Sequence, residues 1–85
     1  MRKEEIKTLL EAGLAGAEVA VDGDDGVHCA ARVVYPGFGG LNPVKRHQLV
    51  YRALGDRMQQ AIHALSLQTF TPEEWERQKP FANLQ

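Results

Sequence analysis

The chain has 85 residues, a formal net charge of -1 and one cysteine, which limits it to a single small domain with one core. No stretch is apolar for long enough to span a membrane, and the N-terminal residues lack the apolar run of a signal peptide. One cysteine excludes an internal disulfide and a metal site built from four thiolates of this chain, and it favours a cytoplasmic protein.

The N-terminal segment predicts one helix and a hairpin. Apolar side chains recur at helical spacing over residues 3–14, which predicts an amphipathic helix. Two alternating stretches follow, over residues 17–22 and 27–35, and the Gly-Asp-Asp-Gly turn between them predicts an antiparallel pair. In the second stretch Cys29 shares the parity of the apolar side chains, whereas His28 has the opposite parity and is predicted to point away from the core.

A loop rich in glycine and proline leads to the second predicted helix. Asn42 can cap this helix, and Pro43 suits its first position. Apolar residues then recur at helical spacing from Val44 to Ala61, which predicts a helix of about five turns.

The remaining residues predict a third strand and a final helix. Residues 61–70 alternate as a strand, and His63 shares the parity of its leucines. Thr71 and Glu74 form a T-x-x-E capping box, which predicts the start of a short helix that ends near Lys79.

The predicted order is therefore α-β-β-α-β-α, in one domain of residues 1–85 with its core over 3–79 and a frayed tail over 80–85. This order predicts an α+β fold in which the helices pack on one face of a three-stranded sheet. The long helix before the third strand allows that strand to pair parallel with the second.

Charge is distributed unevenly along the chain. Residues 1–26 hold seven acidic and three basic side chains, whereas residues 27–60 hold one acidic and five basic ones. The five cations of the middle segment predict a surface for an acidic partner or a nucleic acid. The alternative is that they only make one face of a helix soluble in water. They are Arg32, Lys45, Arg46, Arg52 and Arg57.

Local sequence leaves the roles of the histidines and the cysteine open. Taken alone, His63 fits a hydrogen-bonded histidine of the core, His28 an exposed histidine, and Cys29 a small buried side chain. Their spacing matches no sequence-local zinc motif. The chain also lacks a phosphate-binding loop and a nucleophile elbow, so no enzyme is predicted.

Taken together, these motifs closely resemble the BolA family, and its IbaG-like bacterial branch in particular. The resemblance is carried by F-G-G, V-K-R-H-Q-L-V-Y, I-H-A-L-S-L and T-P-E-E-W, and by a short acidic hairpin followed by a histidine. It covers about residues 6 to 79. It implies a fold similar to a type II KH domain.

The resemblance also implies a non-enzymatic partner of a monothiol glutaredoxin. The two proteins would share a two-iron, two-sulfur cluster in iron homeostasis or cluster delivery, and the glutaredoxin would supply its cysteine and a bound glutathione thiol. This chain would supply His63 and His28, with Cys29 as the alternative to His28. Histidine ligation of one iron raises the reduction potential, as it does in Rieske centres.

A second function implied by the resemblance is a DNA-binding transcriptional regulator linked to stress and cell morphology. The five cations of the middle segment would then contact phosphates. Two features depart from the expected pattern: the family's R-H-R is R-H-Q here, with Gln48, and G-F-G-G does not lie at the junction where a KH domain clamps a nucleic-acid backbone. The oligomeric state of the free protein stays open.

Overall fold

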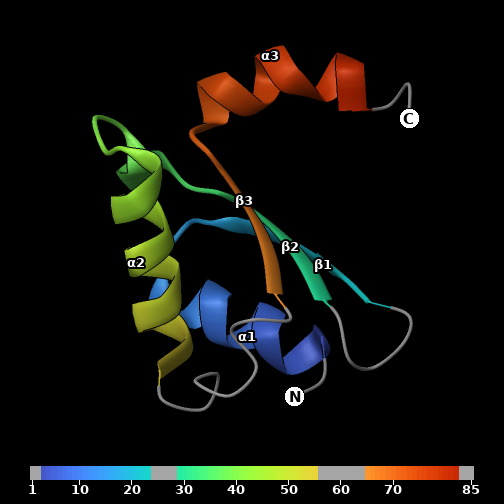
Figure 1. Cartoon of the computed structure of the whole chain (residues 1–85), viewed down its shortest axis with the longest axis vertical. Helices are drawn as coiled ribbons and strands as arrows, with labels where there is room; N and C mark the ends of the chain where they lie inside the picture. Colours follow the sequence, from blue (N-terminus) through green and yellow to red (C-terminus); the bar gives the residue numbers. More distant parts are fainter. Residues whose placement is uncertain (1–2, 24–28, 56–64, 83–85) are drawn as a thin grey trace.

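The computed structural model describes residues 3–23, 29–55 and 65–82. Within them the chain forms three α-helices, one short 3-10 helix and three strands, and the predicted order of helices and strands is confirmed (Figure 1). The bounds are α1 Lys3–Gly13, β1 Glu18–Asp22, β2 Cys29–Val34, η1 Pro36–Phe38, α2 Pro43–Leu54, β3 Leu65–Phe70 and α3 Pro72–Ala82. None of the described helices is long and apolar enough to cross a membrane.

The three strands form one mixed sheet in the order β1-β2-β3. β1 pairs antiparallel with β2, with Val19 opposite Val33, as the turn between them predicts. β2 pairs parallel with β3, and Ala31 lies opposite Leu67. Because a parallel pair needs a long crossover connection, α2 carries the chain back along the sheet between the two strands.

The hydrophobic core lies between one face of the sheet and the helices α1 and α2, which lie side by side in Figure 1. Strand parity explains which side chains enter it, because successive residues of a strand point to opposite faces. The largest fully buried side chains come from α1, β2, η1 and α2: Ile6, Leu10, Val33, Phe38, Val50 and Leu54.

Helix α3 follows β3 directly and lies across the far end of the strands in Figure 1. It packs through Trp75, whose ring lies 5.4 Å from that of Phe70 and under the guanidinium of Arg32. Phe70 and Arg32 have the strand parity opposite to that of the core side chains. The prediction of helices on one face therefore holds for α1 and α2, and α3 adds a contact on the opposite face.

Two helix ends differ from their predicted positions. The helix predicted to reach Ala61 ends earlier, because α2 stops at Leu54; residues 56–61 of the predicted helix lie outside the described residues. Gly55 follows with φ of 70°, a left-handed conformation that favours glycine, and its N–H donates to the carbonyl of Tyr51. At the other end of the chain, α3 continues past the predicted end at Lys79 to Ala82.

Helices α1 and α2 approach each other closely at Gly13. A Cβ atom at this position would lie 2.7 Å from the Cβ of Ala53 and 3.2 Å from its Cα. Both distances are shorter than normal contacts between carbon atoms. The absence of a side chain at Gly13 therefore sets how closely the two helices pack.

We expect Gly13→Ala to lower the free energy of unfolding by about 1–3 kcal/mol, because the added methyl group overpacks the contact between α1 and α2. Helix propensity alone would give the opposite sign, since alanine is favoured over glycine by roughly 0.5–1 kcal/mol within a helix. Urea denaturation measures the change.

Two further variants serve as controls for this prediction. Gly39→Ala places its new atom 3.5 Å from the carbonyl oxygen of Pro36, an ordinary contact, and should be tolerated. The double variant Gly13→Ala/Ala53→Gly should recover most of the stability that Gly13→Ala loses. A stable single variant would contradict the close approach.

Candidate functional site

The two histidines predicted to ligate a cluster, His28 and His63, lie outside the described residues. The structure does describe the strand starts that follow them. Cys29 begins β2 and pairs with Leu65, which begins β3. In the sequence, His28 immediately precedes Cys29 and His63 precedes Leu65 by two residues. The chain segments that carry both histidines thus lead into neighbouring strands at the same end of the sheet.

The described residues contain no group of three or more histidine, cysteine, aspartate or glutamate side chains placed to hold a metal ion. The third histidine, His47, is described and lies on α2, where its half-buried ring packs edge to face with Tyr51 at 6.5 Å. His47 is therefore part of the packing of α2.

The start of α2 is fixed by the residues that the sequence predicts. Asn42 precedes the helix, and its side-chain oxygen accepts a hydrogen bond of 2.9 Å from the backbone N–H of Lys45. Pro43 occupies the first turn, where its missing N–H costs nothing. The predicted cap is confirmed, and it fixes the directions in which the next cations extend.

Arg46 joins the start of α2 to the start of α3. Its Nη1 and Nη2 atoms donate to the two carboxylate oxygens of Glu74 at 2.6 and 3.1 Å. Its Nε atom donates to the carbonyl of Leu41 at 2.9 Å. The Arg46 side chain is 13% exposed and that of Glu74 35%, so the pair is shielded on the Arg46 side. A two-pronged pair of this kind holds a fixed geometry as well as a charge.

Glu74 also closes the capping box at the start of α3. Its Oε1 atom accepts from the backbone N–H of Thr71 at 2.9 Å, and the hydroxyl oxygen of Thr71 accepts from the N–H of Glu74 at 3.1 Å. The predicted T-x-x-E box is confirmed. The hydrogen bonds from Arg46, and then from the Thr71 backbone, lower the pKa of the Glu74 carboxyl to about 2.

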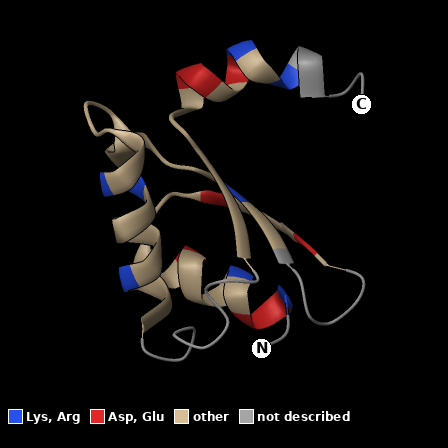
Figure 2. Cartoon of the chain, in the orientation of Figure 1, with Lys and Arg blue, Asp and Glu red and all other residues tan. Residues whose placement is uncertain are grey.

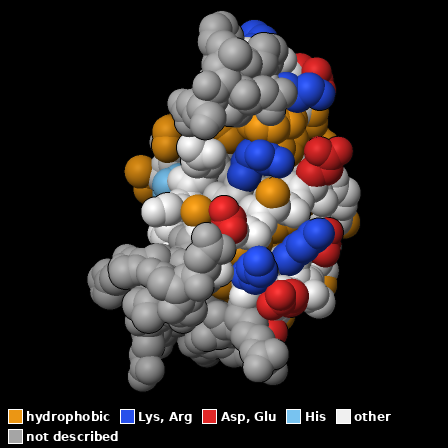
Figure 3. Space-filling view, turned by 90° about the vertical axis from the view of Figure 1, so that its right-hand side faces the viewer, with side chains coloured by type: hydrophobic (Ala, Val, Ile, Leu, Met, Phe, Trp, Pro, Cys, Tyr) orange, Lys and Arg blue, Asp and Glu red, His pale blue; other side chains and the backbone are white. Residues whose placement is uncertain are grey.

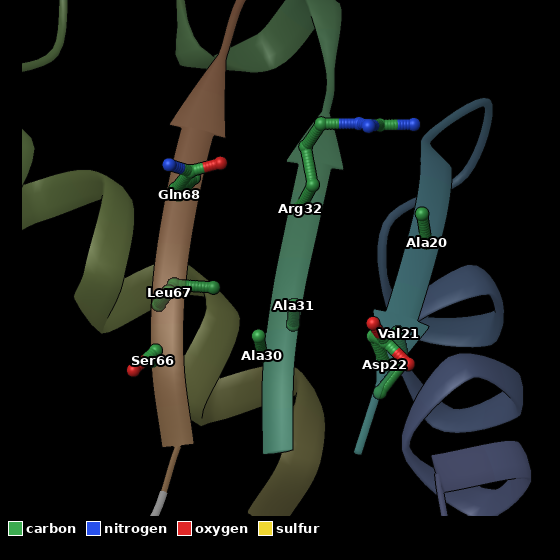
Figure 4. A pocket seen from close by; sticks show the side chains of 9 residues that line it. All are labelled: Ala20, Val21, Asp22, Ala30, Ala31, Arg32, Ser66, Leu67 and Gln68. Carbon is green, nitrogen blue, oxygen red and sulfur yellow. The ribbon is translucent and has the colours of Figure 1, made fainter. Parts of the chain in front are cut away.

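Arg32 lies on the sheet face opposite to the core. Its guanidinium carbon is 4.1 Å from the centroid of the Trp75 ring, a distance suited to a cation–π interaction. Figure 4 shows its side chain extending from β2 toward β1. Arg32 therefore borders the open part of the sheet and also holds α3 in place.

Next to Arg32 the open sheet face forms a shallow hollow of about 340 Å³ (Figure 4). Small side chains, among them Ala20, Ala30 and Ser66, line it, together with Asp22 and Gln68. The side of the molecule that is on the right in Figure 1 carries cationic, acidic and hydrophobic side chains next to one another (Figure 3). This face therefore presents mixed chemistry.

Lys45 and Arg52 are exposed on α2, the helix that packs against the other face of the sheet. The sequence of α2 contains no acidic residue, and Figure 2 shows only cationic charges along it. Val44 beside Lys45 is 65% exposed. Lys45 and Arg52 thus share a surface that is both cationic and partly apolar.

The five predicted cations therefore do not form one patch. Lys45 and Arg52 lie on α2, Arg32 lies on the opposite sheet face, and Arg46 is engaged by Glu74. Arg57 lies outside the described residues. The pairing of Arg46 with Glu74 could not be predicted from local sequence, because 28 positions separate the two residues.

Comparison with known proteins gives a consistent result. Residues 7–74 match the family model for BolA, described as a BolA-like protein. A solved structure of a bolA protein homologue from Coxiella burnetii is 47% identical, with a TM-score of 0.78 over 91% of this chain and 99% of that chain. BolA1 from Arabidopsis thaliana is 34% identical, with a TM-score of 0.71 over 87% of this chain and 95% of that chain.

Among curated relatives, the "DNA-binding transcriptional regulator BolA" of Vibrio cholerae is 44% identical over 50 residues, which cover 59% of this chain and 47% of that protein. The chain spans half or less of the length of this and two other curated relatives, from Arabidopsis thaliana and Haemophilus influenzae.

We expect Glu74→Gln to lower the free energy of unfolding at pH 7 by about 1–2 kcal/mol, since glutamine keeps the capping acceptor but loses the charge paired with Arg46. The loss is smaller than the full pKa change implies, because solvent screens a carboxylate that is one-third exposed. Urea denaturation at pH 7 measures it.

The same pair predicts a pH dependence. The pKa of Glu74 is lower in the folded than in the unfolded state, so its stabilisation is complete above the unfolded value of about 4.5 and is lost as pH falls toward about 2. Wild type should lose more stability across this interval than Glu74→Gln. Glu73→Gln, an exposed neighbour in the same turn, should follow wild type, and equal profiles for all three proteins would refute the assignment.

Proposed function

Because this chain belongs to the BolA family, we propose that it is a non-enzymatic iron–sulfur partner, which binds a monothiol glutaredoxin and shares a two-iron, two-sulfur cluster with it. The observation that carries the proposal is the parallel pairing of β2 with β3. It sets Cys29 beside Leu65, so the segments with His28 and His63 enter neighbouring strands. One domain can thereby offer two ligands from distant parts of its sequence.

The donor set suits such a cluster. Imidazole and thiolate are both ligands of iron in iron–sulfur centres, and histidine on one iron raises the reduction potential. His63 is the first proposed ligand and His28 the second, with Cys29 as the alternative to His28. When bound, the cluster supplies one-electron chemistry or iron and sulfide for delivery. The resemblance to the BolA family implies that the remaining ligands are the glutaredoxin cysteine and a glutathione thiol, and a chain with a single cysteine is compatible with this.

Val44 and Lys45 at the start of α2 are a second proposed contact for the glutaredoxin, at the end of the sheet opposite to the strand starts that follow His28 and His63. Arg46 and Glu74 tie this helix to α3, so the two helix starts hold a fixed relation before any partner binds. Exposed Val44 and Lys45 then add an apolar and a cationic contact. Preorganisation of this kind lowers the entropic cost of association.

We expect anaerobic cluster reconstitution with a monothiol glutaredoxin and glutathione to give a mixed complex. Its visible absorption and circular dichroism should differ from those of the glutaredoxin homodimer. His63→Ala should abolish this difference, and His28→Ala should weaken it. Cys29→Ser tests the alternative ligand. If it changes the spectrum more than His28→Ala does, Cys29 is the second ligand.

His47→Ala is the matched control for this reconstitution, because it removes a histidine that packs on α2. It should form the mixed complex like wild type. A spectrum that never departs from that of the glutaredoxin homodimer, or a normal complex with His63→Ala, would rule out the cluster proposal.

The alternative function is DNA-binding transcriptional regulation. It is supported by the names of two relatives, from Vibrio cholerae and Haemophilus influenzae, each called "DNA-binding transcriptional regulator BolA". On this chain the exposed cations of α2, Lys45 and Arg52, are the best placed phosphate contacts, since Arg46 is engaged by Glu74. The two functions do not exclude each other.

For the alternative, DNA affinity should fall steeply as salt rises, because phosphate neutralisation releases counterions. Lys45→Ala and Arg52→Ala should each reduce the slope of log affinity against log salt by about one. Fluorescence anisotropy with a labelled duplex measures both. Lys79→Ala removes an exposed cation of α3 and should leave the slope unchanged. Binding that is absent, or insensitive to salt, would contradict this function.

A further inference from the structure

The two outer strands of the sheet differ in how they are protected. β1 begins with Glu18 and ends with Asp22, and both side chains are exposed. β3, with the sequence L-S-L-Q-T-F, contains no charged residue, proline or glycine. Proteins usually protect an edge strand with charges, prolines or bulges, because unpaired N–H and C=O groups otherwise attract another strand. β3 pairs with β2, and no other strand of the described residues pairs with it.

β1 and β3 also differ in the charges that meet when each strand is paired with the same strand of a second copy. An antiparallel pair of β1 strands centred on Ala20 would place Glu18 of each copy opposite Asp22 of the other. Like charges directly opposite each other destabilise a sheet. The same arrangement of β3 brings no charges together.

We propose that the outer edge of β3 is a pairing edge for a second copy of this chain. In an antiparallel pair centred on Leu67, Leu67 lies opposite its own copy. Ser66 lies opposite Gln68 of the second copy, and a two-fold axis repeats that pair. The two sheets join into one, and α1 and α2 of both copies lie on the same face, because opposed residues of an antiparallel pair share a face. This inference is independent of the proposed function.

The side chains of β3 fit this arrangement on both faces. Leu67 is half-buried and packs against the core on the helix side, so a second leucine beside it would cover its remaining surface. Ser66 and Gln68 are exposed on the open face, where a hydroxyl and an amide can hydrogen-bond across the pair. The edge also gains backbone hydrogen bonds, as in other cases of strand addition. A net charge of -1 for each copy adds little repulsion.

The test is sedimentation velocity of the full chain over a wide concentration range at low salt, where wild type should shift from monomer to dimer. Ser66→Lys/Gln68→Lys places like charges opposite each other twice, and it should raise the dissociation constant of the dimer by more than about tenfold. Ser66→Lys/Gln68→Glu places opposite charges across the same pairs and should restore the dimer. This reversal depends on the Leu67-centred register.

Gln48→Lys/Gln78→Lys adds the same two charges on exposed helix positions and should dimerise like wild type. Circular dichroism checks that every variant folds. A wild type that stays monomeric at all concentrations would overturn the proposal. So would a dimer that survives Ser66→Lys/Gln68→Lys, or association of β3 only with a different protein.

Discussion

The parallel pairing of β2 with β3 is the constraint on which the rest of this structure depends. A parallel pair cannot be closed by a tight turn, so the chain must cross over, and α2 is that crossover. Once α2 is placed, it supplies Val50 and Leu54 to the core and packs against α1 at Gly13. The same pairing aligns the starts of β2 and β3, which is what makes a shared ligand site at that end of the sheet chemically reasonable.

At the other end of the sheet, two arginines hold α3 from different sides. Arg46 reaches it from α2 through the carboxylate of Glu74, and Arg32 reaches it from β2 across the ring of Trp75. Both are cations of the segment that looks from the sequence like a surface for an acidic partner. These two arginines therefore stabilise the packing of α3, and Lys45 and Arg52 remain as exposed cations on α2.

Sequence reasoning succeeds here where the cause is local. The cap at Asn42 and the box of Thr71 and Glu74 depend on residues three apart, and strand parity depends on alternation alone. It fails where the cause is distant or where two signals compete. Apolar residues recur at helical spacing past Gly55, so periodicity alone predicts a longer helix. In the structure Gly55 ends α2. The partner of Arg46 is set by tertiary packing, which no short window contains. The ligand roles of His28 and His63 stay predictions.

Trp75 gives this fold an unusual optical property. It is the single tryptophan of the chain, and its ring lies between the ring of Phe70 and the guanidinium of Arg32. Intrinsic tryptophan emission therefore reports on one location, the attachment of α3 to the open sheet face, and not on the core between the sheet and α1. Emission and far-ultraviolet dichroism consequently observe different parts of the molecule, and comparing them shows whether the last helix detaches before the sheet unfolds.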